Sequence, residues 1–286
     1  MATRVAFLGP AGTFSEDALL SAAGNTDIDP LPRPSVYAAI RAVAEGEAER
    51  ALVPFENSIE GAVRSTLDTL AFEAEGVAIA GEHDHPIRHS LISRMEIPLE
   101  QVAVVLSHPQ ASAQCARFIR EKLPHATVRA AASTADAVRS VAASDEHWAA
   151  LGAASAARIY ECVVLREGVE DNPENVTRFV WIAPEGIRPS GTGPWRTTLV
   201  FSELGADHPG ALVEALTEFS SRDVNLTRIE SRPLRQGLGR YMFFCDVDGA
   251  AGTGAVAEAI QALRGKAESV RILGSYPIAG NGIPGM

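Results

Sequence analysis

The sequence predicts an α/β protein in which a large domain with a mainly parallel sheet precedes a smaller domain of βαββαβ order. Three observations support this fold class. Short apolar segments alternate with amphipathic helical patterns over residues 1–183. A segment rich in proline and glycine then interrupts the pattern, and the order of strands and helices changes beyond it. The chain of 286 residues is long enough for two domains, each with its own core.

The first domain, residues 1–183, is predicted from strand-length apolar runs that are followed by helical patterns. The helix over Pro109–Lys122 starts with a proline, which suits a first helical turn, and its apolar residues recur along one side. The segment Ser133–Asp136 resembles a capping box and opens a further helix. The expected strands are Val5–Leu8, Arg50–Val53, Val77–Gly81, Ser90–Ser93, Val102–Leu106, Thr127–Ala130 and Trp148–Leu151, with another helix over Val36–Ala44.

Residues 184–196 are predicted to be a linker, because three prolines and three glycines within Ala183–Pro194 can continue neither a strand nor a helix. Residues 197–276 follow the order βαββαβ, which is the ferredoxin-like arrangement. Residues 277–286 are rich in glycine, and we expect a flexible tail there. The expected elements of the second domain are the strands Thr197–Glu203, Asn225–Leu234, Arg240–Val247 and Val270–Ser275 and the helices Gly210–Ser221 and Ala255–Arg264.

Composition argues against several classes of partner and site. The formal net charge of −11 disfavours nucleic acid and anionic membranes, because both require a basic surface. No apolar run has transmembrane length, and the first residues lack the long apolar region of a signal peptide. The three cysteines are scattered among apolar residues, so we expect free thiols in a cytoplasmic protein. We expect no metal, since His83-Asp84-His85 would offer two strand ligands without a third.

Polar residues gather in segments that could share one cleft. Gly9–Glu16 leaves a strand through a glycine turn whose amides could hold an anion, or it is a tight turn with a capping box. Pro54–Gly61 follows a strand end, where open α/β sheets bind ligands, although Asn57-Ser58 could simply cap a helix. The amides that follow Ser107 offer a second possible anion site. His108 suits a turn better than a catalytic base, and Gln114 points either to this site or to solvent.

The segment Asn175–Ile182 places a hydroxyl and a guanidinium, Thr177 and Arg178, at the start of an apolar strand. A buried arginine requires an anion or a carboxylate as partner. The alternative for this segment alone is an ordinary surface ion pair at the beginning of a strand.

Together these segments resemble, in order, the motifs of the prephenate dehydratase family: Gly9–Phe14, Val53–Gly61, Ser107–Gln114 and Thr177–Phe179. In the second domain, Gly210–Val213 and Glu230–Pro233 resemble the Gly-Ala-Leu-Val and Glu-Ser-Arg-Pro segments of that family's regulatory ACT domain. The resemblance extends from Val5 to about Tyr276. It implies a catalytic region of two α/β lobes, like a periplasmic binding protein, with the active cleft between the lobes.

The resemblance also implies the reaction, in which prephenate loses CO₂ and its ring hydroxyl to become phenylpyruvate in phenylalanine biosynthesis, without a metal or other cofactor. Thr177 would assist departure of the hydroxyl, and Arg178 would anchor a carboxylate or brace Thr177. The other catalytic residues that it implies are Asn57, Ser107 and Gln114. The substrate-binding residues that it implies are Gly12, Thr13, Glu56, Ser58 and Phe179.

Feedback inhibition by L-phenylalanine is implied for the ACT domain, together with homodimers or homotetramers that form through this domain. The loop 205–210 would contribute to the effector site. Because the first strand begins at the third residue, we also expect no chorismate mutase domain and therefore a monofunctional dehydratase. The effector-binding residues that the resemblance implies are Gly210, Ala211, Leu212, Val213, Glu230, Ser231, Arg232 and Pro233.

Three other functions are compatible with these patterns. An arogenate dehydratase would use the same scaffold on a substrate that carries an amino group in place of the keto group. A solute-binding or ligand-sensing protein would share the two-lobed fold, but the missing signal peptide and the missing helix-turn-helix pattern count against it. A purely regulatory ACT protein would not need so long a first domain.

Overall fold

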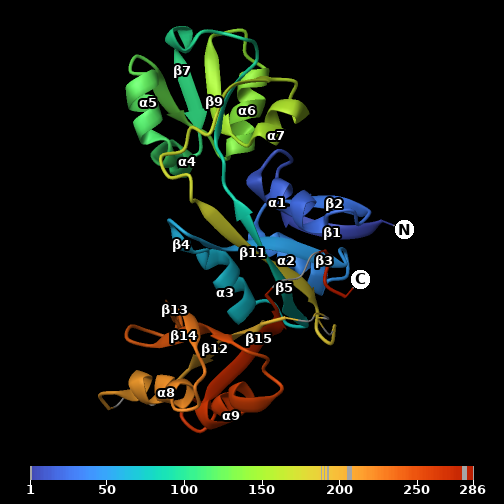
Figure 1. The fold of residues 1–286 in the computed structure, drawn as a ribbon, viewed down its shortest axis with the longest axis vertical. Coiled ribbons are helices and arrows are strands. Elements are labelled where there is room, and N and C mark those ends of the chain that lie inside the picture. Colours follow the sequence, from blue (N-terminus) through green and yellow to red (C-terminus); the bar gives the residue numbers. More distant parts are fainter. Residues whose placement is uncertain are drawn as a thin grey trace.

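The computed structural model describes residues 2–187, 189, 191, 193–204, 208–278 and 282–285. Two α/β lobes and a C-terminal domain follow one another along the long axis of the molecule, with the first lobe in the middle (Figure 1). In the described part of the chain, no helix is both long enough and apolar enough to cross a membrane.

The first lobe is a sheet of strand order β2-β1-β3-β11-β5. Strand β1 runs parallel to β2 and β3, whereas β11 runs antiparallel to both β3 and β5. Its strands are β1 (Thr3–Leu8), β2 (Ile28–Arg33), β3 (Arg50–Asn57), β5 (Val77–Pro86) and β11 (Val176–Pro184), and the short β4 (Gly61–Ala62) pairs with the end of β3. Its helices are α1 (Phe14–Ala23), α2 (Val36–Ala44) and α3 (Arg64–Phe72).

The second lobe has its own sheet, of order β10-β6-β9-β7-β8. The chain enters it through residues 87–89 and returns through residues 168–175, so two extended segments connect the lobes. Its strands are β6 (Ser90–Ser93), β7 (Val104–Ser107), β8 (Thr127–Ala130), β9 (Trp148–Gly152) and β10 (Val163–Glu167). Its helices are the 3₁₀ turn Leu99–Gln101, α4 (Pro109–Gln114), α5 (Ala116–Lys122), α6 (Thr134–Ala142) and α7 (Ala154–Ile159).

Three details of the first domain differ from the sequence prediction. The helix expected over Pro109–Lys122 divides into α4 and α5 because Cys115 has φ −116° and ψ 18°, outside the helical region. Strand β2 is not among the expected strands; it contains Pro30 and Pro32, which are tolerated because β2 lies at the edge of its sheet. Strand β10, also at a sheet edge, was missed as well.

The C-terminal domain has the expected βαββαβ order, with its sheet arranged β13-β14-β12-β15. Strand β12 starts at Trp195, within the residues expected to form the linker. Its elements are β12 (Trp195–Ser202), α8 (Ala211–Ser220), β13 (Leu226–Pro233), β14 (Tyr241–Asp248), α9 (Gly254–Leu263) and β15 (Ser269–Pro277).

Alternation along β14 divides the C-terminal sheet into two faces. Cys245 and Val247 pack with the residues of α8 and α9 in one core cluster. Met242 and Phe244 belong instead to a core cluster that includes Val180 of β11 and other residues of the first lobe. The C-terminal domain therefore shares a hydrophobic core with the first lobe and is not a loosely tethered unit.

Two further contacts join the C-terminal region to the first lobe. Strand β15 pairs in parallel with β5 at Gly274 and Ile79, which connects the two sheets. Beyond β15, Ile283 is buried in the core cluster of the first lobe, and the Arg50 guanidinium donates to the Pro284 carbonyl at 3.0 and 3.1 Å. Residues 282–285 of the expected flexible tail are thus held against the first lobe, whereas residues 279–281 lie outside the described residues.

We predict that Gly274→Ala weakens the junction between the two sheets. A Cβ atom at this position would lie 2.2 Å from the Ile79 carbonyl oxygen, so the backbone would have to move. Overpacking of this kind costs about 1–3 kcal/mol of unfolding free energy. The measurement is urea unfolding, with Gly252→Ala as the control, because a Cβ atom at Gly252 meets no atom within 4 Å. Equal stability of the two variants would contradict a tight β15–β5 contact.

Candidate active site

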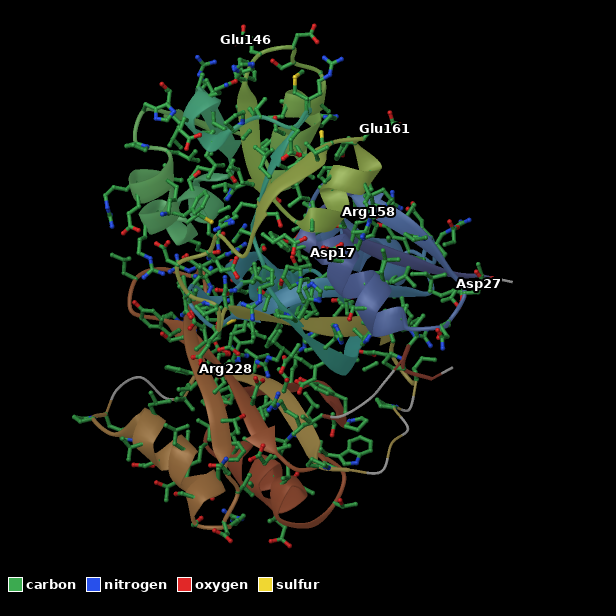
Figure 2. All side chains as sticks on the ribbon, turned by 45° about the horizontal axis from the view of Figure 1, so that its top comes forward. Asp17, Asp27, Glu146, Arg158, Glu161 and Arg228 are labelled. Atoms are coloured by element: carbon green, nitrogen blue, oxygen red, sulfur yellow. The ribbon has the colours of Figure 1, made fainter. Side chains whose placement is uncertain are left out.

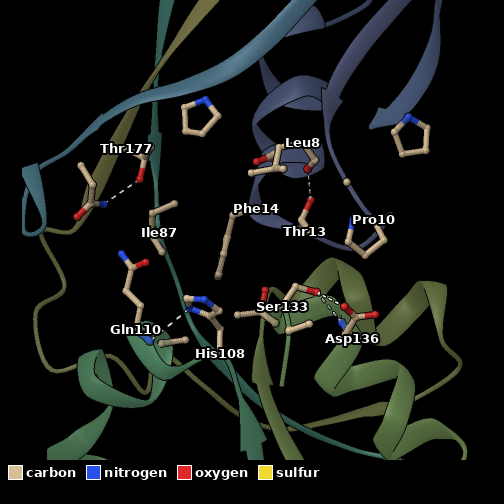
Figure 3. Close-up of a pocket in the computed structure, with 18 of the residues that line it drawn as sticks. Leu8, Pro10, Thr13, Phe14, Ile87, His108, Gln110, Ser133, Asp136 and Thr177 are labelled. Carbon is tan, nitrogen blue, oxygen red and sulfur yellow. Dashed lines mark hydrogen bonds between the residues drawn. The ribbon is translucent and has the colours of Figure 1, made fainter. Parts of the chain in front are cut away.

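A cleft of about 740 Å³ lies between the two lobes. Figure 3 shows Thr177, Phe14 and Ile87 on one side of it and Gln110, His108 and Ser133 on the other. The first lobe contributes the turn after β1, the end of β3 and the start of β11, and the second lobe contributes the starts of α4 and α6.

Helices from opposite lobes begin at this cleft. Thr13 is the N-cap residue of α1, and its hydroxyl donates to the Leu8 carbonyl at 3.1 Å instead of capping the helix. Ser133 caps α6 by accepting from the Asp136 amide at 3.0 Å. A helix N-terminus carries partial positive charge and unpaired amides. The two ends together suit a ligand with more than one negative group.

The side chains of Asn57 and Thr177 meet at the floor of the cleft. The Asn57 side-chain amide donates from Nδ2 to Thr177 Oγ1 at 2.8 Å, while its Oδ1 accepts from the amides of Ile59 and Glu60 at 3.0 Å each. These two backbone donors fix the orientation of the Asn57 amide, since a flip would set NH₂ against N–H. Because Asn57 Nδ2 can only donate, Thr177 Oγ1 must accept, and its own hydrogen is free to donate into the cleft.

The hydrogen bonds continue from Asn57 into the segments that connect the lobes. Asn57 Nδ2 also donates to Asn175 Oδ1 at 2.8 Å, and Asn175 Nδ2 donates to Gln114 Oε1 at 3.1 Å. Gln114 Oε1 lies 3.1 Å from His89 Nε2, and since an amide oxygen can only accept, Nε2 carries the proton. The Glu170 carboxylate accepts from the His89 backbone amide at 2.8 Å. Thr177 is therefore held by a network that crosses between the lobes.

His89 is neutral in this network. Burial of the ring lowers the pKa of His89, although the hydrogen bond with Gln114 and the charge of Glu170 act in the opposite direction. The contact with Gln114 requires a proton on Nε2, and the lowered pKa favours the neutral ring, in which Nδ1 carries none. The ring also packs edge-on against Phe14, with 5.0 Å between the ring centroids.

A β-bulge determines which residues of β3 face the cleft. In the pairing of β11 with β3, Arg178 lies opposite Glu56 and Phe179 lies opposite Pro54, so Phe55 is an extra residue on β3. Pro54 and Asn57 are three positions apart, so strict alternation would place them on opposite faces of the sheet. Because of the bulge, both line the cleft.

Arg178 does not lie in the cleft. Residues 177 and 178 are neighbours on one strand, so their side chains project from opposite faces of the sheet. Arg178 forms ion pairs with Glu56 at 2.9 Å and with Asp246 of the C-terminal domain at 2.6 Å. Glu56 and Ser58 line a separate cavity of about 290 Å³ beside Arg178.

The remaining residues implied by the resemblance divide into two groups. Thr13, Asn57, Gln114, Thr177 and Phe179 line the cleft. Ser107 is fully buried, and its hydroxyl donates to the Leu151 carbonyl at 3.1 Å. The Gly12 amide donates to Glu16 at 2.7 Å, which is a local contact within the turn.

The sequence reasoning missed several residues of the site. His89 and Asn175 take part in the hydrogen-bond network, and Phe14 and Ser133 line the cleft. Phe14 and Ser133 each begin or cap a helix that the sequence indicated, so their positions were within reach of the prediction. His89 and Asn175 lie in the connecting segments, whose contacts depend on how the lobes face each other. Among the described residues, no group of three or more His, Cys, Asp or Glu is placed to hold a metal ion.

A second, smaller cavity of about 170 Å³ lies in the C-terminal domain, between the start of α8 and the β13–β14 hairpin. Of the expected effector-binding residues, Ala211 and Leu212 line it, whereas Val213 is 67% exposed and points elsewhere. Arg232 pairs with Asp68 of α3 at 2.7 Å. Gly210 is the N-cap residue of α8, residues 205–207 lie outside the described residues, and Glu230, Ser231 and Pro233 do not line this cavity. The lining residues are Glu203, Leu204, Ala211, Leu212, Leu234, Gly239, Arg240, Tyr241 and Phe243.

Comparison with known families identifies the two domains. The family model described as prephenate dehydratase matches residues 5–186, which is more than half of the chain. The chain belongs to the prephenate dehydratase family. An ACT domain model matches residues 198–265, which identifies the C-terminal domain. The fold expected from the sequence, an α/β catalytic domain followed by a ferredoxin-like ACT domain, is thereby confirmed.

Individual relatives are similar to this chain over almost its whole length. A prephenate dehydratase of Mycobacterium marinum is 42% identical over 282 residues, covering 96% of this chain and 88% of the relative. The structure of a prephenate dehydratase from Arthrobacter aurescens in complex with L-Phe has 40% identity and a TM-score of 0.88, with coverage of 98% and 91%. A solved structure named GqqA, described as a novel type of quorum quenching acylase, has 32% identity and a TM-score of 0.86, with coverage of 96% and 98%. Two proteins with this fold have different descriptions, so the fold alone does not decide the reaction. The reaction has to be argued from the residues of the cleft.

Proposed function

We propose that this dehydratase binds prephenate in the interlobe cleft and that Thr177 donates a hydrogen bond to the departing ring hydroxyl. The C–O bond breaks as CO₂ leaves, the ring becomes aromatic, and the hydroxide takes up a proton to form water. The observation that carries the proposal is the Asn57 amide, which donates to Thr177 Oγ1 at 2.8 Å and so leaves the threonine hydrogen free. A donor that is oriented in advance stabilises the charge that develops on the leaving oxygen.

The rest of the cleft suits both the substrate and the planar product. The N-termini of α1 and α6 can each face one carboxylate of prephenate. Neither carboxylate then depends on a cationic side chain of its own in the cleft. Phe14, Ile87 and Phe179 provide apolar surface for the ring. A volume of about 740 Å³ lies within the usual range of small-molecule sites.

The nearest alternative substrate is arogenate, whose ammonium group would need an acidic partner. Among the residues that line the cleft, Asp136 is the acidic one. Its two oxygens already accept hydrogen bonds, at 3.0 Å from Ser133 Oγ and at 2.6 Å from Arg139 Nη2. This arrangement favours prephenate, and parallel assays with both substrates distinguish the two reactions. A solute-binding protein would bind without turnover.

Thr177→Ala should retain the fold and lower kcat about 10²–10⁴-fold, the range for one group that assists proton transfer. Thr177→Ser keeps the hydroxyl and is the matched control, which should retain most of the turnover. The measurement is phenylpyruvate formation from prephenate, with circular dichroism as the check on folding. If the folded Thr177→Ala protein turns over normally, Thr177 has no role in the departure of the hydroxyl.

We further propose that L-phenylalanine binds in the 170 Å³ cavity of the ACT domain and inhibits the enzyme. The Arthrobacter aurescens relative was solved with L-Phe, which supports this choice of effector. Leu204, Leu212 and Phe243 offer apolar contacts for the phenyl ring. Glu203 and Arg240, which form an ion pair at 2.6 Å, offer partners for the ammonium and the carboxylate.

Assembly and location remain predictions. A homodimer or homotetramer formed through the ACT domains is supported by exposed apolar residues there, including Val213, Ile229 and Tyr241. Strand β13 is the outer strand of the ACT sheet and could pair with a second copy. The cytoplasmic location still rests on the three scattered cysteines.

Ala211→Leu should fill the ACT cavity and raise the phenylalanine concentration for half inhibition by at least about tenfold, which corresponds to 1.4 kcal/mol of binding free energy. The control is Val213→Leu on the same helix, since Val213 is exposed and does not line the cavity. A point substitution is preferable to removal of the ACT domain, which would expose the core shared with the first lobe. Equal loss of inhibition in both variants would place the effector elsewhere.

A further inference from the structure

Strand β11 carries the candidate catalytic hydroxyl on one face and a buried guanidinium on the other. The Arg178 side chain is 11% exposed and lies over the Phe55 ring, 5.0 Å from its centroid. Its terminal nitrogens contact Glu56 of β3, Glu82 of β5 and Asp246 of β14 at 2.9, 3.5 and 2.6 Å. The shortest of these ion pairs is the one with the ACT domain.

Asp246 is the centre of this cluster. Its carboxylate is completely buried and accepts from Arg178, from Arg228 Nε at 2.8 Å and from Thr198 Oγ1 at 2.8 Å. Arg228 belongs to β13, and its guanidinium also lies over the Phe55 ring, 4.6 Å from the ring centroid. Figure 2 labels Arg228 where the ACT sheet meets the first lobe. Arg228 of β13 and Thr198 of β12 thus both donate to the Asp246 carboxylate, which in turn pairs with Arg178.

The charges of the cluster fix its protonation states. Burial opposes ionisation of Asp246, but Arg228 and Arg178 together hold the pKa of this carboxyl below its usual range. Burial likewise opposes the charge on Arg178, but Asp246 together with neighbouring groups that include Glu82 more than offsets it, so the pKa of Arg178 is raised. Both groups are charged, and a buried charge keeps its position only while its partner is present.

The backbone of β11 is paired on both sides at this point, with β5 in continuous register and with β3 through a bulge. Its pairing with β3 shifts register between Arg178 and Phe179, and a bulge locally disrupts the ladder of backbone hydrogen bonds. Thr177 is the residue immediately before the disrupted step. Arg178, which pairs with carboxylates from three other strands, adds a side-chain restraint on the β3 side, where the backbone pairing is interrupted.

We propose that Asp246 of the ACT domain is a positioning residue for the dehydratase reaction, which holds Thr177 in its donating position through Arg178. This inference rests on the proposed role of Thr177. The ACT domain is then part of the support of the active site, and displacement of its sheet changes turnover by moving Arg178. Misplacement of a reacting group by about 1 Å can lower a rate about 10²-fold.

A second ion pair between the domains serves as the matched control. Asp68 of α3 accepts from Arg232 of β13 at 2.7 and 3.0 Å and from Arg235 at 2.7 Å. It also joins the ACT domain to the first lobe, but neither Arg232 nor Arg235 lies on β11. Asp246→Asn and Asp68→Asn therefore both remove a carboxylate between the domains, and of the two only Asp246→Asn removes an ion pair of Arg178, the shortest one.

The test is a double-mutant cycle on kcat at saturating prephenate. We expect Asp246→Asn to lower kcat about 10–100-fold, whereas Asp68→Asn changes it less than about twofold. In a Thr177→Ala background, Asp246→Asn should lower kcat by less than about threefold, because a hydroxyl that is absent cannot be misplaced. Where Asp246→Asn does not fold, Thr198→Val removes one hydrogen bond to Asp246 and keeps its charge, and the same non-additivity is expected from it.

Two results would overturn the proposal. Equal effects of Asp246→Asn and Asp68→Asn would show that Asp246 only stabilises the domain contact. An undiminished effect of Asp246→Asn in the Thr177→Ala background would show that it acts independently of Thr177. Failure of the proposed function is distinguishable from both, since in that case Thr177→Ala by itself leaves kcat unchanged.

Discussion

The alternation of side chains along β11 is the constraint on which the rest of the molecule depends. Consecutive residues of a strand point to opposite faces, so Thr177 reaches the interlobe cleft only if Arg178 points to the ACT domain. A guanidinium on that face requires carboxylates, and strands β3, β5 and β14 provide them. The candidate active-site cleft and the contact between the domains therefore lie on the two sides of one strand.

This arrangement gives the ACT domain a short physical route to the chemistry. Its sheet shares a hydrophobic core with the first lobe, and its strand β15 joins β5 where Gly274 permits close approach. A ligand that shifts the ACT sheet relative to the first lobe must move or break the contact between Asp246 and Arg178. Inhibition then requires no contact between the effector and the substrate.

The sequence predicted the fold well because its main signals are local. Apolar runs identified most strands, and the βαββαβ order followed from the pattern alone. Thr177, Asn57 and Gln114 were found because they belong to recognisable motifs. Of the two roles implied for Arg178, anchoring a carboxylate of the substrate or bracing Thr177, its place outside the cleft fits the second, and Glu56 also lies on that side; strand alternation and the bulge at Phe55 determine this, and the motifs alone do not show it. His89 and Asn175 were missed because their contacts arise only when the two lobes come together.

The most direct test of the account is the kcat of Asn57→Asp. Aspartate keeps an oxygen for the amides of Ile59 and Glu60, but its second oxygen accepts from Thr177 and takes the hydrogen away from the cleft. We predict a folded enzyme whose kcat at saturating prephenate falls about 10²–10⁴-fold. An unchanged kcat would show that the direction of the Thr177 hydrogen bond does not matter for turnover, which would contradict the central claim.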